Sequence, residues 1–525
     1  MINKKNTTIF LISAVFVLLG ILPDILGQTL TARNAFRIGG FMGRPGVSDL
    51  MILEQIKQGN LLIKNLFTSE NQANLLLPIS HLPFGLLGKF FNISSGNLII
   101  MEKILYAILF IGTFLWFIKI FYKDIKKQLI TLIFLLFGSG FGLLVHPAIQ
   151  ASSDLWISEM YPLAALWNQP ASLLYFSLIL VSIYLCLKIY QNNSLKSVFF
   201  PLLLLLTVFE KPQIVVLISF SLFIFILIKA KNTHEILLKF RVLWFYLIIP
   251  LLVLCVYVIK IYTSQNIWLW IGQSGFYSPP FMNYIAGCGI LGIFAFIFIV
   301  KNDAERINNG HLLLFCWICA AIVLLYTPFP QQRLFDFGLF IPVSILASEP
   351  LLGFIMSCRT KLKKKIHFLI FFAILVFLLF GTHSYLFYLT FRTYFEDPHS
   401  SASIIFNNDR KAFSWIKNNT DKNSIFVTDA LYGHIVPAFT GRAVYFAKRN
   451  GSFATINLNA KTEEVKHFFF YSSSSEQLDF LRKNHISYIF LGQKEADESD
   501  LKMWKQKSYL EIVYQNDGVA VLKVR

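Results

Sequence analysis

Long runs of apolar residues alternate with short polar connections over the first 392 residues of the chain. Most of these runs hold close to 20 residues, the length that an α-helix needs to cross a hydrocarbon core of roughly 30 Å. The pattern predicts eleven hydrophobic helices: 9–27, 98–121, 128–146, 171–190, 197–209, 212–230, 241–261, 282–300, 311–327, 334–356 and 367–391. The run 197–209 is short for a span at about 1.5 Å per residue, so 197–230 forms either two crossings or a re-entrant hairpin.

The pattern changes after residue 392. Within 404–525, the stretch DRKAFSWIKNNT has apolar residues at helical spacing, with Asn408 as the expected N-cap. The stretches SIFVTD, AVYFA and ISYIFLG predict strands, and YLEIVYQNDGVAVLKV predicts a hairpin that turns at Asp517-Gly518. We therefore expect an α-helical polytopic membrane domain over 1–392, followed by an α/β domain over 393–525 with a partly parallel sheet covered by helices.

Composition and charge support a membrane protein. Only 14% of the residues are charged and 55% are hydrophobic, whereas soluble domains carry about 25% charged residues. The net charge of +18 could indicate a nucleic-acid partner. However, lysine and arginine gather in every second connection, as in 119–127, 229–241 and 359–365, whereas 147–170 and 263–280 carry none. This is the positive-inside pattern, so the expected partner is the lipid bilayer and not nucleic acid.

The same charge pattern predicts the topology. Lys4 and Lys5 precede the first run and no small-x-small cleavage site directly follows it, so we expect a retained anchor with a cytoplasmic N-terminus. The loops 28–97 and 147–170 are then extracytoplasmic, as is everything after residue 392. All six cysteines lie in or beside the hydrophobic runs, so no disulfide framework is expected in the C-terminal domain.

Acidic and basic side chains gather at the predicted outer face. They are Asp49 and Glu54 in the first outer loop, Asp154 and Glu159 in the second, and Lys211 and Arg333 near later helix ends. Two acidic loops and two cations at one membrane surface indicate a site that handles an acceptor group and an anionic leaving group. The alternative is that outward loops simply need polar residues, because a helix start favours an acidic side chain.

Several stretches of the chain resemble the GT-C superfamily of multi-pass glycosyltransferases. They are SDLMILEQIKQGNLLIKNLFTSE with ISHLPFGLLGKFFNIS, GSGFGLLVHPAIQASSDLWISEMYPLAALWNQP, PFPQQRLFDFGLFIPVSILA, YGHIVPAFTGRAVYFAKRNGS and ISYIFLGQKE. Within the superfamily, the chain resembles prokaryotic mannosyltransferase-like membrane proteins with an exported C-terminal domain. The resemblance implies transfer of a sugar from a polyprenyl-phosphate donor to an acceptor glycan, lipid or protein outside the cytoplasmic membrane.

The resemblance also implies roles for individual residues. Asp49 occupies the place of an essential acidic residue and would act as the base on the acceptor hydroxyl. Glu54, Asp154 and Glu159 would hold the acceptor or a divalent cation, Mg²⁺ or Mn²⁺, although no cofactor follows with certainty. Arg333 would pair with the donor phosphate and Lys211 would share that charge. A single base opposite the leaving group implies inversion at the anomeric carbon.

Two further residues are candidates for substrate contact. His81 lies near the predicted outer face, where a structural role is the alternative. Tyr277 belongs to the short loop 270–280, which would line a sugar or lipid groove or belong to an interfacial aromatic belt.

Three functions stay open from the sequence. Besides a glycosyltransferase, they are a lipid or glycan transporter and a non-catalytic membrane scaffold or sensor. A transporter usually shows internal repeats, and the sequence has none. The enzyme hypothesis requires Asp49 and Arg333 to border a common cavity on the extracytoplasmic side.

Overall fold

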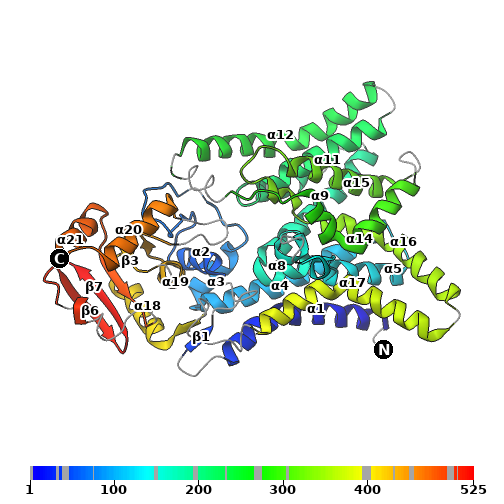
Figure 1. Cartoon of the computed structure of the whole chain (residues 1–525). Helices are drawn as coiled ribbons and strands as arrows, with labels where there is room; N and C mark the ends of the chain where they lie inside the picture. Colours follow the sequence, from blue (N-terminus) through cyan, green and yellow to red (C-terminus); the bar gives the residue numbers. More distant parts are fainter. Residues whose placement is uncertain are drawn as a thin grey trace. The chain divides into compact units, whose positions relative to one another are not determined.

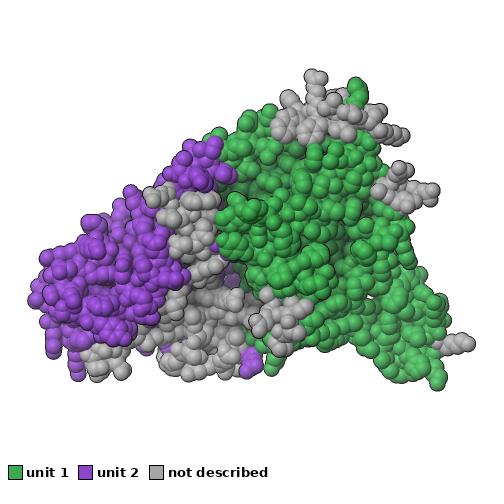
Figure 2. Space-filling model, turned by 45° about the horizontal axis from the view of Figure 1, so that its top comes forward, with its two compact units in different colours: residues 1–22, 102–257, 276–391 green, residues 23–101, 258–275, 392–525 purple. Residues whose placement is uncertain are grey.

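The computed structural model describes most of the chain and groups it into two compact units. The described residues are 4–30, 35–37, 46–74, 76–146, 152–192, 199–230, 233–264, 266, 275–302, 307–362, 364–392, 404–429, 432–447, 455–493, 502–504 and 506–525. Unit 1 is formed by 1–22, 102–257 and 276–391, and unit 2 by 23–101, 258–275 and 392–525 (Figure 2).

Every predicted hydrophobic run forms helix in the structure (Figure 1). The corresponding elements are α1 (Lys4–Leu30), α4 (Ser95–Phe117), η2 (Ile118–Ile120), α5 (Ile125–Phe137), α6 (Gly142–Val145), α9 (Ala171–Asn192), α10 (Phe199–Val208), α11 (Gln213–Lys229), α12 (Thr233–Thr263), α14 (Phe281–Lys301), α15 (Asn309–Leu325), η3 (Gln332–Asp336), α16 (Phe340–Lys361) and α17 (Lys365–Arg392). Among the described residues, eight segments are long and apolar enough to cross a membrane. The shorter apolar helices α10, α11 and α15 account for the other three predicted runs. These helices, together with the C-terminal sheet, confirm the predicted fold class.

Glycine lies at the interruptions of several predicted helices, among them the runs 128–146 and 282–300. The predicted run 128–146 ends its first helix at Phe137, with Gly138 as the C-cap, and resumes at Gly142. Between these points the N–H of Ser139 donates to the carbonyl of Leu379, and that of Phe141 donates to the carbonyl of Ala286. The run 282–300 contains Gly289 at φ +53°, a left-handed conformation that glycine adopts without steric cost.

Unit 2 contains a mixed five-stranded sheet of order β4-β3-β5-β7-β6. Its strands are β3 (Ile425–Val427), β4 (Ala443–Val444), β5 (Tyr488–Leu491), β6 (Leu510–Asn516) and β7 (Val519–Val524). β3 runs parallel to both β4 and β5, whereas β7 is antiparallel to β5 and β6. β6 and β7 form a hairpin (Figure 1). It turns at Gly518, whose φ is +76°, as the Asp-Gly sequence predicts.

Short helices accompany this sheet. They are α18 (Asn407–Asn419), α19 (Tyr432–Thr440), α20 (Leu458–Phe470) and α21 (Ser474–Lys483). The expected N-cap at Asn408 is wrong, because α18 starts one residue earlier and Phe406 is its N-cap. The carboxylate of Asp409 accepts a hydrogen bond from the N–H of Phe406 and so takes over the capping function.

The first outer loop shares a hydrophobic core with the C-terminal sheet inside unit 2. This loop contains α2 (Val47–Lys57) and α3 (Leu82–Phe91), and a short strand β1 (Ala35–Arg37) that pairs with β2 (Ile404–Phe406). One cluster of buried side chains joins Val47, Met51 and Ile56 of this loop to Phe413 and Val436 of the C-terminal helices. The predicted domain boundary at residue 392 stays a prediction.

We expect Gly140→Ala to destabilise unit 1. An added Cβ would lie inside van der Waals contact of the carbonyl oxygens of Ala286 and Gly287, which are backbone atoms. The two segments would have to separate, and overpacking of this kind costs about 1–3 kcal/mol. The thermal unfolding midpoint of the detergent-solubilised protein measures the loss. Gly112→Ala is the control, because it lies inside α4 with nothing within 4 Å of an added Cβ. Equal midpoints for the two variants would contradict the close approach.

Candidate functional site

Arg333 is a buried cation that the backbone and two aromatic rings hold in place. The backbone N–H of Arg333 donates to the carbonyl of Phe276 at 3.0 Å. The backbone N–H of Phe276 in turn donates to the carbonyl of Pro330 at 2.7 Å. The guanidinium carbon lies 4.7 Å from the ring centroid of Trp156 and 4.6 Å from that of Phe276. A guanidinium is attracted to the face of an aromatic ring, so both contacts fix its position.

Glu159 is the counter-ion of Arg333. Its Oε1 lies 3.4 Å from Nη2 of Arg333, and both side chains are about 5% exposed or less. Gln169 and Ser158 each donate a further hydrogen bond to the carboxylate. Burial by itself raises the pKa of Glu159, but Arg333 and Lys211 outweigh it, so this pKa lies below its ordinary value. Glu159 is therefore a buried anion.

Asp336 belongs to the same cluster and was not singled out from the sequence. It is fully buried, and its Oδ2 accepts a hydrogen bond from the hydroxyl of Tyr284 at 3.1 Å. Its Oδ1 and the Nε of Arg333 have no hydrogen-bond partner among the described residues. The signal that could have identified Asp336 is its spacing from Arg333. The two residues are three positions apart on a 3₁₀ turn, in which the side chains of residues i and i+3 lie on the same side. The sequence did not single out Trp156, and it marked Phe276 only as part of the loop 270–280.

Lys211 completes what we call the Arg333 cluster: Glu159, Lys211, Arg333 and Asp336 with the rings of Trp156 and Phe276. The Lys211 ammonium nitrogen lies 5.5 Å from the ring centroid of Phe337, the residue after Asp336. Two cations and two carboxylates are thus gathered in unit 1. Three of these four, Glu159, Lys211 and Arg333, were candidates from the sequence, and the structure brings them together.

Asp154 has other partners. Its Oδ2 accepts hydrogen bonds from the N–H groups of Gly140 at 2.9 Å and Gly142 at 3.2 Å, and its Oδ1 accepts one from the Ser152 hydroxyl at 2.6 Å. The residue is 1% exposed. Burial raises the pKa of Asp154, and these hydrogen bonds oppose the rise. The contacts give Asp154 a structural task, which is to hold the glycine segment between α5 and α6; its predicted role toward acceptor or metal stays a prediction.

Asp49 lies in the first turn of α2, in unit 2. Its side chain is 21% exposed, and its Oδ1 lies 3.7 Å from Nε2 of His81, which is buried at the start of α3. His81 therefore contacts the predicted base, whereas its contact with substrate stays a prediction. The side chain of Tyr277 is 65% exposed beside Phe276, and its role also stays a prediction. Residues 271–274 of its loop lie outside the described residues.

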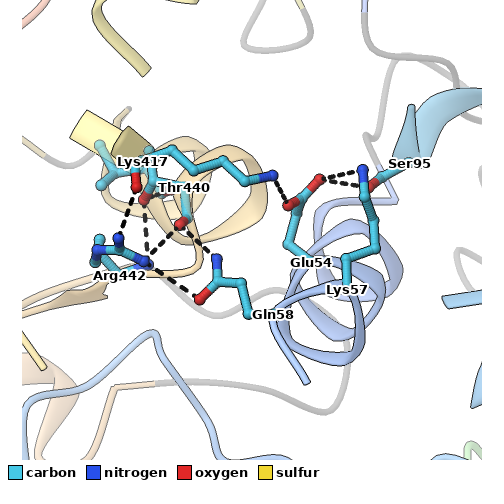
Figure 3. Close-up of polar contacts among 8 residues, drawn as sticks. Glu54, Lys57, Gln58, Ser95, Lys417, Thr440 and Arg442 are labelled. Carbon is cyan, nitrogen blue, oxygen red and sulfur yellow. Dashed lines mark hydrogen bonds and ion pairs between the residues drawn. The ribbon is translucent and has the colours of Figure 1, made fainter. Parts of the chain in front are cut away.

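Glu54 is bound into the structure of unit 2. Its carboxylate accepts a hydrogen bond from the Ser95 hydroxyl at 2.5 Å and pairs with the ammonium groups of Lys57 at 3.3 Å and Lys417 at 2.5 Å (Figure 3). These contacts join α2 to α4 and to α18. Its predicted role toward acceptor or metal stays a prediction.

The divalent cation that the sequence left possible stays a prediction. No group of three or more His, Cys, Asp or Glu side chains within them lies close enough to hold a metal ion. Asp154 is engaged by backbone N–H groups, and Glu159 by a guanidinium. Asp49 and Arg333 lie in different units, so the expected common cavity stays a prediction.

Comparison with known proteins identifies the fold. No family model matches the sequence, and no curated protein matches it. The chain superimposes on the oligosaccharyltransferase of Archaeoglobus fulgidus with a TM-score of 0.53 at 12% identity, covering 92% of this chain and 69% of that one. Another structure of that protein contains an inhibitory peptide and a dolichol-phosphate.

Two further likenesses extend over nearly the whole chain. ArnT from Cupriavidus metallidurans, bound to undecaprenyl phosphate, matches with a TM-score of 0.52 at 12% identity, covering 97% of each chain. The mycobacterial arabinofuranosyltransferase AftD matches with a TM-score of 0.55 at 11% identity, covering 98% of this chain and 41% of AftD. The chain therefore has the fold of the GT-C membrane glycosyltransferases, as the sequence resemblance predicted. At these identities the likeness establishes the fold, and the activity has to be argued from the site.

We expect Glu159→Ala to lower the free energy of unfolding by about 3–5 kcal/mol, because it leaves the buried Arg333 guanidinium unpaired. Glu159→Gln should cost less, since the amide oxygen still accepts a hydrogen bond from Arg333. Glu349→Ala is the control: its carboxylate pairs with Lys127 where the side chains are 38% and 50% exposed, and such pairs contribute about 1 kcal/mol or less. Equal shifts of the unfolding midpoint for Glu159→Ala and Glu349→Ala would rule out a buried ion pair.

Proposed function

We propose that the chain is a membrane glycosyltransferase that moves a sugar from a polyprenyl-phosphate donor to an extracytoplasmic acceptor. The observation that carries the proposal is the match to ArnT over 97% of both chains, since ArnT was solved with undecaprenyl phosphate bound. The Arg333 cluster adds independent support, because it places two cations where an anionic group would be stabilised.

Arg333 and Lys211 would bind the donor phosphate. As the bond between the anomeric carbon and the phosphate oxygen breaks, its electron pair passes to the phosphate, and fixed cations stabilise the charge that develops there. The Nε–H of Arg333 is buried without a hydrogen-bond partner among the described residues, so it is the donor that a phosphate oxygen would take. The contacts with Trp156 and Phe276 keep the guanidinium in place before the donor binds.

Asp49 would act as the base. It takes the proton of the acceptor hydroxyl while that oxygen forms its bond to the anomeric carbon, and attack opposite the phosphate inverts this carbon. His81, 3.7 Å away, would orient the carboxylate. The proposal requires Asp49 and Arg333 to act on the same sugar. It also places the N-terminus in the cytoplasm and both acidic loops outside the cytoplasmic membrane, as the distribution of lysine and arginine predicts.

The acceptor is a glycan, a lipid or a protein, and all three offer the hydroxyl or amide that the chemistry needs. A structure of the Archaeoglobus protein contains Zn and sulfate. The steps proposed for this chain use only the side chains of Asp49, Lys211 and Arg333.

A transporter is the second candidate, because apolar segments of this chain are interrupted. The interruptions at Gly138 and Gly289 are of the kind that transporters place near their binding sites. Transport would be independent of Asp49 as a base. Release of the sugar to the far side without a new glycosidic bond would favour this candidate over the enzyme.

We expect Asp49→Asn to lower sugar transfer by about 10²- to 10⁴-fold, because the amide cannot accept the proton. The lipid-linked sugar that co-purifies with the full-length protein is first identified by mass spectrometry, and the same donor then serves in the transfer assay. Asp49→Asn should still co-purify with this lipid, whereas Arg333→Gln should lose it.

The control for both variants is Asp479→Asn, an exposed carboxylate on α21 of unit 2. It should match the wild-type protein in lipid content and in transfer. Unchanged transfer by Asp49→Asn would refute its role as the base, and absence of any polyprenyl-phosphate sugar from all preparations would count against the donor class.

A further inference from the structure

Most of helix α2, which carries Asp49 in its first turn, is buried inside unit 2. Eight of its 11 residues are buried, among them Leu53 and Glu54. An isolated helix of this length is marginal in water, so tertiary packing must hold it. The helix packs against α19, and its apolar residues belong to the same core cluster as Ile416 and Val436 of the C-terminal domain.

The middle of α2 is tied to α18 by an ion pair. The ammonium group of Lys417 reaches the carboxylate of Glu54, which also accepts a hydrogen bond from Ser95 at the start of α4 (Figure 3). Glu54 lies five residues after Asp49, about 7.5 Å along the helix axis. The pair is therefore close enough to the predicted base for a displacement at one to move the other.

The end of α2 is tied to the C-terminal domain by Gln58 and Arg442. The amide nitrogen of Gln58 donates to the carbonyl of Thr440 at 2.9 Å, and its oxygen accepts from Nη1 of Arg442 at 3.3 Å (Figure 3). The same guanidinium donates to the carbonyls of Thr440, Lys417 and Thr420 and to the hydroxyl of Thr420. Arg442 is 3% exposed, and each of its three nitrogens has a partner.

The chain that follows α2 continues along the edge of the sheet. The N–H of Val444 in β4 donates to the carbonyl of Leu66 at 3.0 Å, and the hydroxyl of Thr455 donates to the carbonyl of Phe67 at 2.6 Å. A half-buried ion pair of 2.5 Å joins Lys461 to Glu70, three residues after Phe67. The C-terminal domain thus contacts α2 at Glu54 and Gln58, and it also contacts the segment beyond α2 at Leu66, Phe67 and Glu70.

These contacts differ in what they fix. Apolar packing is not directional, so a core alone lets a helix rotate or slide by small amounts. Hydrogen bonds to Gln58 and the ion pair to Glu54 are directional, and they set the rotation of α2 about its axis. A misplacement of 1 Å can cost about 100-fold in rate, so this rotation matters for a base in the first turn.

We propose that the C-terminal domain positions the base: Lys417 and Arg442 are positioning residues that fix the orientation of α2 and thereby of Asp49. This inference rests on the proposed function, in which Asp49 takes the acceptor proton. Two alternative roles of the domain are acceptor recognition and stabilisation of the fold alone. Each role predicts a different result in the experiment.

The test compares Lys417→Met and Arg442→Lys with the wild-type full-length protein in proteoliposomes. Each variant should lower kcat for transfer from the co-purified donor by about 10- to 100-fold, with the KM values for donor and acceptor unchanged. Lys417→Arg keeps the charge and should restore most of the rate. Hydrogen–deuterium exchange should show faster exchange of the α2 amides in Lys417→Met, and no change in β5 or β7.

Lys466→Met is the matched control, since Lys466 pairs with Glu463 at 2.8 Å on the exposed surface of α20 in the same unit. It should change neither kcat nor exchange in α2. A raised KM for acceptor at constant kcat would overturn the proposal in favour of acceptor binding. A lower unfolding midpoint with unchanged kcat would reduce the domain to support of the fold.

Exchange also separates this proposal from the proposed function. If the wild-type protein transfers no sugar, the proposed function fails, but exchange in α2 still reports whether Lys417 and Arg442 fix the helix. Unchanged exchange in both variants would overturn the positioning role whatever the activity.

Discussion

The position of α2 depends on the apolar core that this helix shares with the C-terminal domain. Val47, Met51 and Ile56 are buried in that core beside residues more than 350 positions later in the chain. The helix is too short to persist alone, so the same burial that stabilises unit 2 also determines where Asp49 lies. Stability and geometry are therefore coupled here.

In unit 1, the buried guanidinium of Arg333 is held by an ion pair and hydrogen bonds. Taking a guanidinium out of water is costly unless a carboxylate and further hydrogen bonds compensate, and Glu159 with Gln169 and Ser158 provides that compensation. Replacing a buried ion pair by apolar residues of similar volume is often neutral or stabilising. The Arg333–Glu159 ion pair is therefore weak evidence that these residues serve stability alone. Among the described residues, the Nε of Arg333 and the Oδ1 of Asp336 have no hydrogen-bond partner, so each can still form a hydrogen bond.

The sequence predicted those features that depend on neighbours along the chain. Each hydrophobic run became helix because its apolar length is a local property, and the β6–β7 hairpin followed from Asp517-Gly518. The breaks at Gly138 and Gly289 were not predicted, because whether a glycine interrupts a helix depends on packing. Gly289, for example, lies against the backbone of Gly140. The clustering of Glu159 with Lys211 and Arg333 followed from their common place at predicted helix ends. Trp156, Phe276 and Lys417 could not be found, since their partners lie 57 or more residues away and nothing local distinguishes them.

The partners of each carboxylate separate the acidic residues that looked alike in the sequence. A general base needs a lone pair that can reach the proton it takes. Asp154 accepts from two backbone N–H groups and a hydroxyl, and Glu54 accepts from a hydroxyl and lies between two ammonium groups. Glu159 is held as an anion beside Arg333 at 4% exposure. Asp49, at 21% exposure in the first turn of a helix, is the carboxylate among these four with the most solvent access. Removing a proton from an incoming acceptor requires that access, so the exposure of Asp49 supports the proposal that it is the base.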